Sequence, residues 1–268
     1  MAARLHVLGS GSRGNCLALE WDGAVLLVDA GFSRREIERR AVEAGLDLDG
    51  LAGIVLTHEH GDHTGGLRQV LRKRPAPVFA SPGTWAALNA SLPPDTTHCA
   101  IGLAAPREAG PFRIEACPSI HDAAEPVAVV VTTPDGARIG VAYDLGRPTG
   151  AVRYLLREAA VLVLEANHDE ILLRTSGYPP VVQQRIAGSG GHLSNRAAAD
   201  LVRELLHPEL EHVVLAHLSE RCNTADHARL AVEPVLQRAG FQGRLHVARQ
   251  DVGLPVIEVL GPRQARMF

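Results

Sequence analysis

The sequence predicts an α/β protein in which capped helices alternate with short buried strands. Two observations lead to this class. First, several runs of aliphatic and β-branched residues have the length and composition of buried strands, at residues 53–56, 127–131, 139–142, 161–164 and 213–216. Second, other segments have apolar residues at helical spacing behind cap residues. The chain has 268 residues, 46% of them hydrophobic, and no linker or low-complexity stretch divides it, so we expect a single domain over residues 1–268.

The first part of the chain is predicted to form a strand, a hairpin and a helix. A strand near residues 4–8 is followed by a glycine-rich turn. The next two strands, at 16–21 and 24–28, flank Asp22-Gly23, which is a strong signal for a two-residue hairpin. Ser33 and Glu36 then have the spacing of a capping box, which predicts that a helix begins there.

Two further helices are predicted in the last third of the chain. One has a single apolar stripe behind a cap at Ser194 or Asn195, and its stripe consists of Ala198, Leu201, Val202, Leu205 and Leu206. The other runs from about residue 223 to residue 240.

Composition excludes several classes of protein. No run approaches the ~20 apolar residues of a membrane span, and the first residues lead straight into a strand without a signal peptide, so we expect a cytoplasmic protein that does not enter a membrane. The 4 cysteines are far apart and form no C-x-x-C pair, which argues against a disulfide framework or a thiolate zinc site. The net charge of -3 provides no general attraction to nucleic acid, so a polyanionic substrate would need a local basic patch.

Polar residues follow four of the predicted strands at the point where each strand ends. Thr57 and His58 follow the first of them, Asp144 another, Glu165 the third and His217 the last. Open sheets bind ligands beyond the carboxyl ends of their strands, where loops carry polar groups over a rigid base. We therefore expect these strand ends to converge on one site.

The densest group of candidate ligands places three imidazoles and one carboxylate within six residues: His58, His60, Asp62 and His63. Alternate positions of an extended loop point the same way, so His58 and His60 could bind one ion while Asp62 and His63 turn toward a second. Imidazole and carboxylate without thiolate suit zinc first, with manganese or iron as alternatives. A histidine-rich solvated turn is the competing interpretation.

This group resembles the HxHxDH signature of the metallo-β-lactamase superfamily, and the similarity extends through nearly the whole chain. Within the superfamily the sequence is most similar to bacterial DNA exonucleases of the YycJ (WalJ) type, through the segments 9–15, 27–31, 165–169, 191–195 and 215–219. The resemblance implies a four-layer αββα sandwich with a dinuclear metal site along one edge of its two sheets.

The resemblance also implies a ligand set. It assigns His58, His60 and His121 to the first metal, assigns Asp62, His63 and His217 to the second, and makes Asp144 the bridge between them. Asp29 would orient the cluster through hydrogen bonds. His121 could instead be an ordinary loop histidine and Asp144 an ordinary turn residue.

A hydroxide shared by two metal ions could attack a phosphate, so no nucleophilic side chain is required. The reaction would still require a group that donates a proton to the leaving oxygen. His192 is the candidate general acid, because it follows Gly190-Gly191 and lies just before a helix amino terminus that favours an anion. A linker histidine is the alternative. Asp62 and His168 are the other catalytic candidates, with a structural role for His168 left open.

The chemistry of such a site would suit a phosphodiester, a thioester or a lactam, and the fold hosts all three. A carboxylate bridge without a cysteine ligand, and the lack of an added helical glutathione-binding region, favour the phosphodiester. The resemblance then implies DNA, digested from a 5′ end. The predicted substrate contacts are Asn15, Asn167, Asn195, Arg174, Tyr178 and Arg185.

Two alternatives to a DNA exonuclease stay open at this stage. A small cyclic phosphodiester would need fewer positive groups than DNA, in keeping with the net charge of -3. A metal-binding partner protein that has kept the fold but has no activity is the other. The oligomeric state is also open.

Overall fold

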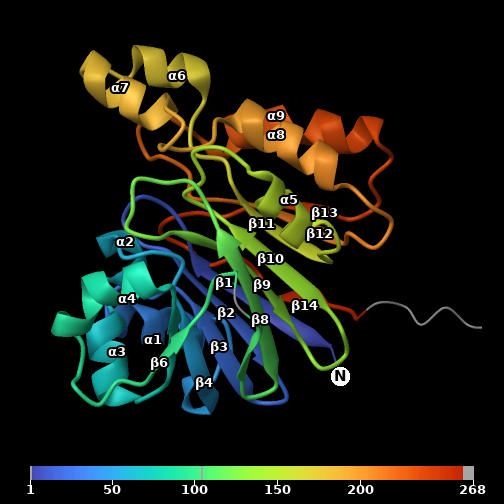
Figure 1. The fold of residues 1–268 in the computed structure, drawn as a ribbon. Coiled ribbons are helices and arrows are strands. Elements are labelled where there is room, and N and C mark those ends of the chain that lie inside the picture. Colours follow the sequence, from blue (N-terminus) through green and yellow to red (C-terminus); the bar gives the residue numbers. More distant parts are fainter. Residues whose placement is uncertain (1, 104, 262–268) are drawn as a thin grey trace, which may run out of the picture.

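The computed structural model describes residues 2–103 and 105–261. Two β-sheets pack face to face, and helices cover the outer face of each sheet (Figure 1). This arrangement confirms the α/β class and the αββα sandwich.

The first sheet contains seven strands in the order β14-β1-β2-β3-β4-β5-β6. Its strands are β1 (Ala3–Gly9), β2 (Cys16–Trp21), β3 (Ala24–Val28), β4 (Leu51–Val55), β5 (Val78–Ala80), β6 (His98–Ala100) and β14 (Ile257–Val259). The strands from β14 to β3 pair antiparallel, and those from β3 to β6 pair parallel. The carboxyl ends of β3 and β4 therefore lie side by side.

The second sheet has the corresponding order, β13-β12-β11-β10-β9-β8-β7. Its strands are β7 (Arg107–Ala109), β8 (Phe112–Pro118), β9 (Val127–Thr132), β10 (Arg138–Ala142), β11 (Val161–Glu165), β12 (His212–Ala216) and β13 (Arg244–Val247). Pairing is antiparallel from β7 to β10 and parallel from β10 to β13. The carboxyl ends of β10, β11 and β12 thus meet at one edge.

The helices fall into two groups. The first group contains α1 (Arg34–Glu43), α2 (Gly61–Thr64), α3 (Leu67–Lys73) and α4 (Pro82–Leu88), with 3-10 turns η1 (Leu48–Gly50) and η2 (Asn89–Ser91). The second contains α5 (Gly150–Leu156), α6 (Glu170–Thr175), α7 (Pro180–Ala187), α8 (Asn195–Leu205) and α9 (Ala225–Arg238). In Figure 1, α6 and α7 project from the sandwich above the other helices of their group.

Three hydrophobic cores follow from the alternation of side chains along the strands. In β2, Leu17 and Leu19 face the core between the sheets, while Cys16 and Ala18 face the core beneath α1, α3 and α4. In the second sheet, Leu162 and Leu164 of β11 face the core beneath α5, α8 and α9. Because each sheet is buried on both faces, its central strands are almost entirely apolar, which made them recognisable in the sequence.

The predicted hairpin is confirmed at Cys16–Trp21 and Ala24–Val28, and the other predicted strands agree to within two residues. Ser33 caps α1 as predicted, since its hydroxyl accepts from the backbone N–H of Glu36. The reciprocal half of the capping box is not formed, because the Glu36 carboxylate binds Arg39 and Arg40 instead. Ser194, of the two candidates, is the cap of α8.

None of the helices in the described ranges has the length and apolarity that crossing a lipid bilayer requires.

We expect the core between the sheets to dominate stability. Phe112 of β8 is fully buried in this core, so Phe112→Ala should lower the free energy of unfolding by about 3–5 kcal/mol. Leu230→Ala, at an exposed position of α9, should change it by less than about 0.5 kcal/mol. Urea denaturation followed by circular dichroism measures both, and equal effects of the two substitutions would contradict this picture of the core.

Candidate metal centre

The candidate ligands lie where the two sheets present the carboxyl ends of their parallel strands. His58 follows β4 of the first sheet, while Asp144 and His217 follow β10 and β12 of the second. Asp29, after β3, has φ 60°, and Asp144 and His217 have φ 52° and 53°. Non-glycine residues adopt this left-handed conformation only where the surroundings hold them in it, and such positions cluster at functional sites.

Three imidazoles form the first group. One ring nitrogen from each of His58, His60 and His121 lies within 4.8 Å of the others. Nε2 of His121 is 3.3 Å from Nδ1 of His60, and Nδ1 of His121 is 3.0 Å from the carbonyl oxygen of Gly191. A hydrogen bond from the other ring nitrogen is the usual way in which a metal-binding histidine is oriented. Three nitrogen donors at this separation match a zinc-type site.

The second group combines Asp62, His63, Asp144 and His217, again with one ligand atom of each within 4.8 Å of the others. Nε2 of His217 lies 3.2 Å from Asp62 Oδ2, and Nε2 of His63 lies 2.6 Å from Asp144 Oδ2. The same Asp144 oxygen is 3.6 Å from Nε2 of His58. The Asp144 carboxylate therefore lies between the two groups.

The polar atoms at this junction fit divalent cations. In the described residues, Nε2 of His58 is buried without a hydrogen-bond partner, and the carboxylate oxygens of Asp144 lie close only to imidazole nitrogens, without well-aligned hydrogen bonds. Buried polar atoms are normally satisfied, and buried charges are normally paired or bound to a metal. The donor set is imidazole and carboxylate without thiolate, which suits zinc, manganese or iron.

Burial and the charges around the junction hold His58 and Asp144 in their metal-binding forms. Burial, together with the nearby charge of His63, holds the pKa of His58 well below its usual value, so this imidazole is neutral. Burial would raise the pKa of Asp144, but the charges of His217 and His63 outweigh it and hold that pKa well below its usual value. A neutral imidazole and an ionised carboxylate are the forms that ligate metals. Burial would lower the pKa of His63 and of His217, but the Asp144 carboxylate outweighs it and raises both pKa values well above the usual value. These two imidazoles would therefore each release a proton on binding metal.

Asp29 orients the ligand-bearing loop through hydrogen bonds in the protein interior. It is fully buried, and its carboxylate accepts from the backbone N–H and the hydroxyl of Thr57, each at 2.8 Å. Its Oδ2 also lies 2.7 Å from Nδ1 of His63, which leaves Nε2 of that ring for the centre. Gly31 permits this close packing, because a Cβ there would lie 1.8 Å from the carbonyl oxygen of Asp62.

Glu165 was one of the strand-end residues expected to converge on the site, but no ligand or catalytic role was predicted for it from the sequence. It is fully buried, and its Oε1 lies 2.7 Å from Nδ1 of His192 and 3.2 Å from Nδ1 of His217. Burial would lower the pKa of His192, but Glu165 and Asp144 outweigh it and raise that pKa to about 9. His192 is thus held next to the ligands in its protonated form. A carboxylate at the end of an otherwise apolar strand was the available signal.

The three predicted asparagine contacts are buried and make hydrogen bonds inside the protein. The amide nitrogen of Asn15 lies 3.1 Å from Nε2 of His63, and that of Asn167 donates to the carbonyl oxygen of His217. Asn195 exchanges hydrogen bonds with Asn223. These contacts favour a supporting role for the asparagines over the substrate contact expected from the sequence.

The other predicted residues lie around the mouth of the centre. Arg185 of α7 pairs with Asp122, and Arg221 stacks 4.5 Å above the Tyr178 ring. Arg174 of α6 and His168 line a cavity that also includes His192. The structure therefore brings the predicted ligands together and places the predicted arginines on the projecting helices nearby.

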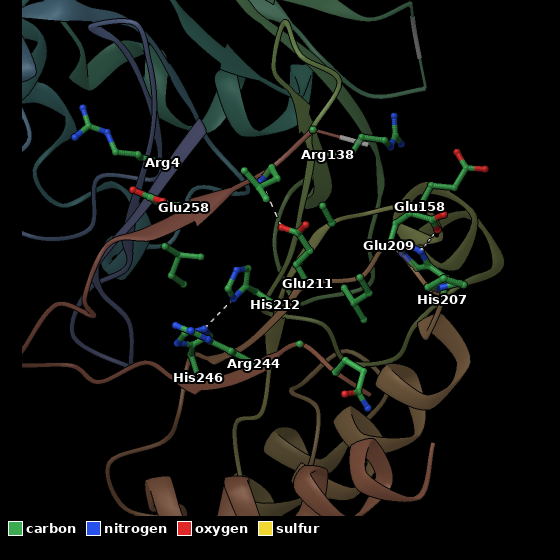
Figure 2. A pocket seen from close by; sticks show the side chains of 18 of the residues that line it. Arg4, Arg138, Glu158, His207, Glu209, Glu211, His212, Arg244, His246 and Glu258 are labelled. Carbon is green, nitrogen blue, oxygen red and sulfur yellow. Dashed lines mark hydrogen bonds and ion pairs between the residues drawn. The ribbon is translucent and has the colours of Figure 1, made fainter. Parts of the chain in front are cut away.

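A larger cavity, of about 1370 Å³, lies away from this centre (Figure 2). Arg138 and His212, in its wall, begin β10 and β12, whose opposite ends lead to Asp144 and His217. Figure 2 shows a mixture of arginine, glutamate and histidine side chains in this cavity. Nδ1 of His212 lies 3.1 Å from Nε2 of His246. Size alone does not make it the reactive site, because the candidate ligands lie at the other ends of these strands.

Comparison with known proteins agrees with this geometry. The model of the beta-lactamase superfamily domain matches residues 25–218. The chain is 34% identical to exodeoxyribonuclease YycJ of Bacillus anthracis over 90% of this chain and 92% of that protein. It is 29% identical to exodeoxyribonuclease WalJ of Streptococcus pneumoniae over 96% and 98% of the two chains.

Two solved structures share the fold. The metallo-beta-lactamase fold protein YhfI of Bacillus subtilis has a TM-score of 0.72 at 19% identity, covering 96% of this chain and 100% of that one. A diphosphatase from the PhnP family has a TM-score of 0.66 at 17% identity, with 97% and 99% covered.

Asp29 should control metal affinity without binding metal. Asp29→Asn keeps the shape of the side chain but removes the charge that orients His63, so we expect metal affinity to fall by about 10–100-fold while circular dichroism stays unchanged. Competition with a chromogenic chelator measures the affinity. Asp226→Asn, at an exposed position of α9, is the control. Equal affinity in the two variants would show that Asp29 does not hold the ligands.

Proposed function

The chain belongs to the beta-lactamase superfamily, and on that basis we propose that it is a dinuclear-metal-dependent phosphodiester hydrolase that degrades DNA from the 5′ end. The observation that carries the proposal is the position of His192. Its Nδ1 lies 3.1 Å from Asp144, between the two ligand groups, and 2.7 Å from Glu165. A proton donor is therefore fixed beside a centre that suits two cations. We treat residues 1–268 as one domain, because both sheets contribute to this site.

The ligand groups suggest how two ions would be held. His58, His60 and His121 would hold the first, Asp62, His63 and His217 the second, and Asp144 both. Zinc is the proposed metal, with manganese or iron as alternatives. Such ions, when bound, activate water and polarise the phosphodiester.

Side chains of the protein would accept and donate the protons that the reaction transfers. As the oxygen of water bonds to phosphorus, one of its protons can pass to Asp62, whose side chain keeps 24% of its surface exposed. The bond from phosphorus to the leaving sugar oxygen breaks, and that oxygen takes a proton from His192. Glu165 keeps the imidazole of His192 oriented and charged for this step.

DNA is the proposed substrate because the nearly full-length relatives described above are named exodeoxyribonucleases. The net charge of -3 means that DNA must be bound locally. Arg174, Tyr178 and Arg185 lie on or between the projecting helices α6 and α7 and could contact the backbone or a base. His168, in the same cavity as His192, could contact the substrate there.

Salt dependence tests the substrate class. Metal-loaded protein should release nucleotides from the 5′ end of labelled DNA, and log(kcat/KM) should fall linearly with log[salt] because phosphate contacts release counterions. A 2′,3′-cyclic nucleotide should show almost no slope. Single- and double-stranded DNA, each labelled at the 5′ end, should be assayed in parallel, with Asp144→Ala as the control for contaminating nuclease.

A flat salt dependence on DNA, together with faster turnover of the cyclic nucleotide, would replace the exonuclease with a small-molecule phosphodiesterase. Wild-type protein that binds metal but hydrolyses none of these substrates would favour a metal-binding partner protein.

The leaving group tests the role of His192. His192→Ala should lower DNA turnover by roughly 10²–10⁴, the usual scale for a lost general acid. The loss on bis(p-nitrophenyl) phosphate should be much smaller, because p-nitrophenolate departs without a proton. Metal content should not change, and elemental analysis checks this.

Equal losses on the two substrates would instead indicate that His192 positions the phosphate. Loss of metal would place His192 among the ligands. One ligand atom of His192 lies within 4.8 Å of ligand atoms of Asp144, Glu165 and His217, so the geometry permits His192 to bind a metal ion.

A further inference from the structure

A cavity of about 350 Å³ opens next to the metal centre on the side of His192. It shares His192 with the centre, and Gly146, two residues after Asp144, forms part of its wall. Its volume lies at the lower end of the roughly 300–1,000 Å³ that small-molecule pockets have. The cavity is thus large enough for one nucleotide and too small for a folded or helical nucleic acid.

The walls of the cavity combine small apolar residues with a few polar ones. Leu173, Leu193 and Ala197 provide the apolar part. Arg174, His168, Glu170 and Ser194 provide polar groups, and the Ser194 hydroxyl donates to the Glu170 carboxylate. Such a mixture suits a ligand that has an apolar ring and a charged end.

His168 is only 2% exposed, and its Nδ1 is buried without a hydrogen-bond partner in the described residues. A proton on Nδ1 would be buried unpaired, so the neutral ring carries its proton on Nε2. The Nε2–H group of His168 is therefore the hydrogen-bond donor that this ring can offer to a ligand in the cavity.

Arg174 lies in the last turn of α6, and Ala187 ends α7. The helices that project from the sandwich in Figure 1 therefore supply the outer wall of the cavity. Arg174 is exposed and forms no salt bridge within residues 2–103 and 105–261. Its guanidinium is free to bind a phosphate group.

The position of the cavity relative to His192 determines what it would hold. His192 gives its proton to the leaving oxygen, so the part of the substrate that carries this oxygen lies on the His192 side. In digestion from a 5′ end, that oxygen is the O3′ of the terminal nucleotide. We propose that the cavity binds the terminal deoxynucleotide, with its 5′-phosphate on Arg174 and its sugar or base against Leu173 and Leu193. This inference rests on the proposed exonuclease function.

Because the released product would leave from this cavity, a deoxynucleoside 5′-monophosphate should bind to it and inhibit the enzyme. Isothermal titration calorimetry on metal-loaded protein should show thymidine 5′-monophosphate binding at least about tenfold more tightly than inorganic phosphate or thymidine. Arg174→Ala should weaken its binding by about tenfold or more, the scale of one charged hydrogen bond.

A second variant would narrow the cavity by a substitution at an exposed residue, which should leave the hydrophobic core unchanged. Ala187 is exposed at the end of α7, so Ala187→Phe should block the cavity, abolish thymidine 5′-monophosphate binding and leave metal content intact. The matched controls are Arg238→Ala, at the exposed end of α9, and Ala86→Phe, at an exposed position of α4. Both controls should bind the nucleotide as the wild type does.

Two results separate failure of this inference from failure of the proposed function. If wild-type protein digests DNA but binds thymidine 5′-monophosphate no better than phosphate, or if both cavity variants bind it normally, the cavity is not a nucleotide site. If wild-type protein leaves DNA intact, the exonuclease function is wrong. Nucleotide binding that is lost in both cavity variants would, in that case, still support the pocket.

Discussion

The buried carboxylate of Asp144 is the constraint on which the rest of the centre depends. It is 2% exposed, and histidines from both sheets surround it: His58 and His63 from the first, His192 and His217 from the second. A buried charge of this kind is stable only when it is paired, so the surrounding imidazoles and the carboxylate require one another. Glu165 adds a second fully buried carboxylate to this arrangement, and it contacts His192 and His217.

The backbone at these positions is held in a conformation that most residues avoid. Asp29, Asp144 and His217 each follow a parallel strand with positive φ, which costs on the order of 1–3 kcal/mol per residue. Specific hydrogen bonds offset this cost: the hydroxyl of Ser10 accepts from the His217 N–H, and Glu165 accepts from the N–H that follows Asp144. The sharp turn after each strand directs the side chains of Asp144 and His217 toward ligands of the first sheet, and that of Asp29 toward Thr57 and His63 after the neighbouring strand.

The main features of the fold could be predicted from the sequence because they are local. Apolar runs identified the long buried strands, whereas three-residue strands such as β5, β6 and β7 are too short to carry a pattern. The spacing from His58 to His63 pointed directly to a metal site. The strand-end pattern marked Asp144 and His217 as candidates, but their ligand roles needed the family resemblance, because their partners are distant in the chain. The role of Glu165 was missed for the same reason. The inward orientation of Asn15 is likewise a tertiary effect that no local pattern shows.

The division of the ligands between the two sheets has a mechanical consequence. His60 and Asp62 follow a strand of one sheet, whereas His121 and His217 follow strands of the other, so an ion held between them would join two layers whose interface is mainly apolar. It would act as a reversible cross-link at the open edge of the sandwich. By mass action, the folded state would then be favoured in proportion to the logarithm of the free metal concentration. The free metal concentration would thereby set the stability of the contact between the two sheets as well as the activity of the protein.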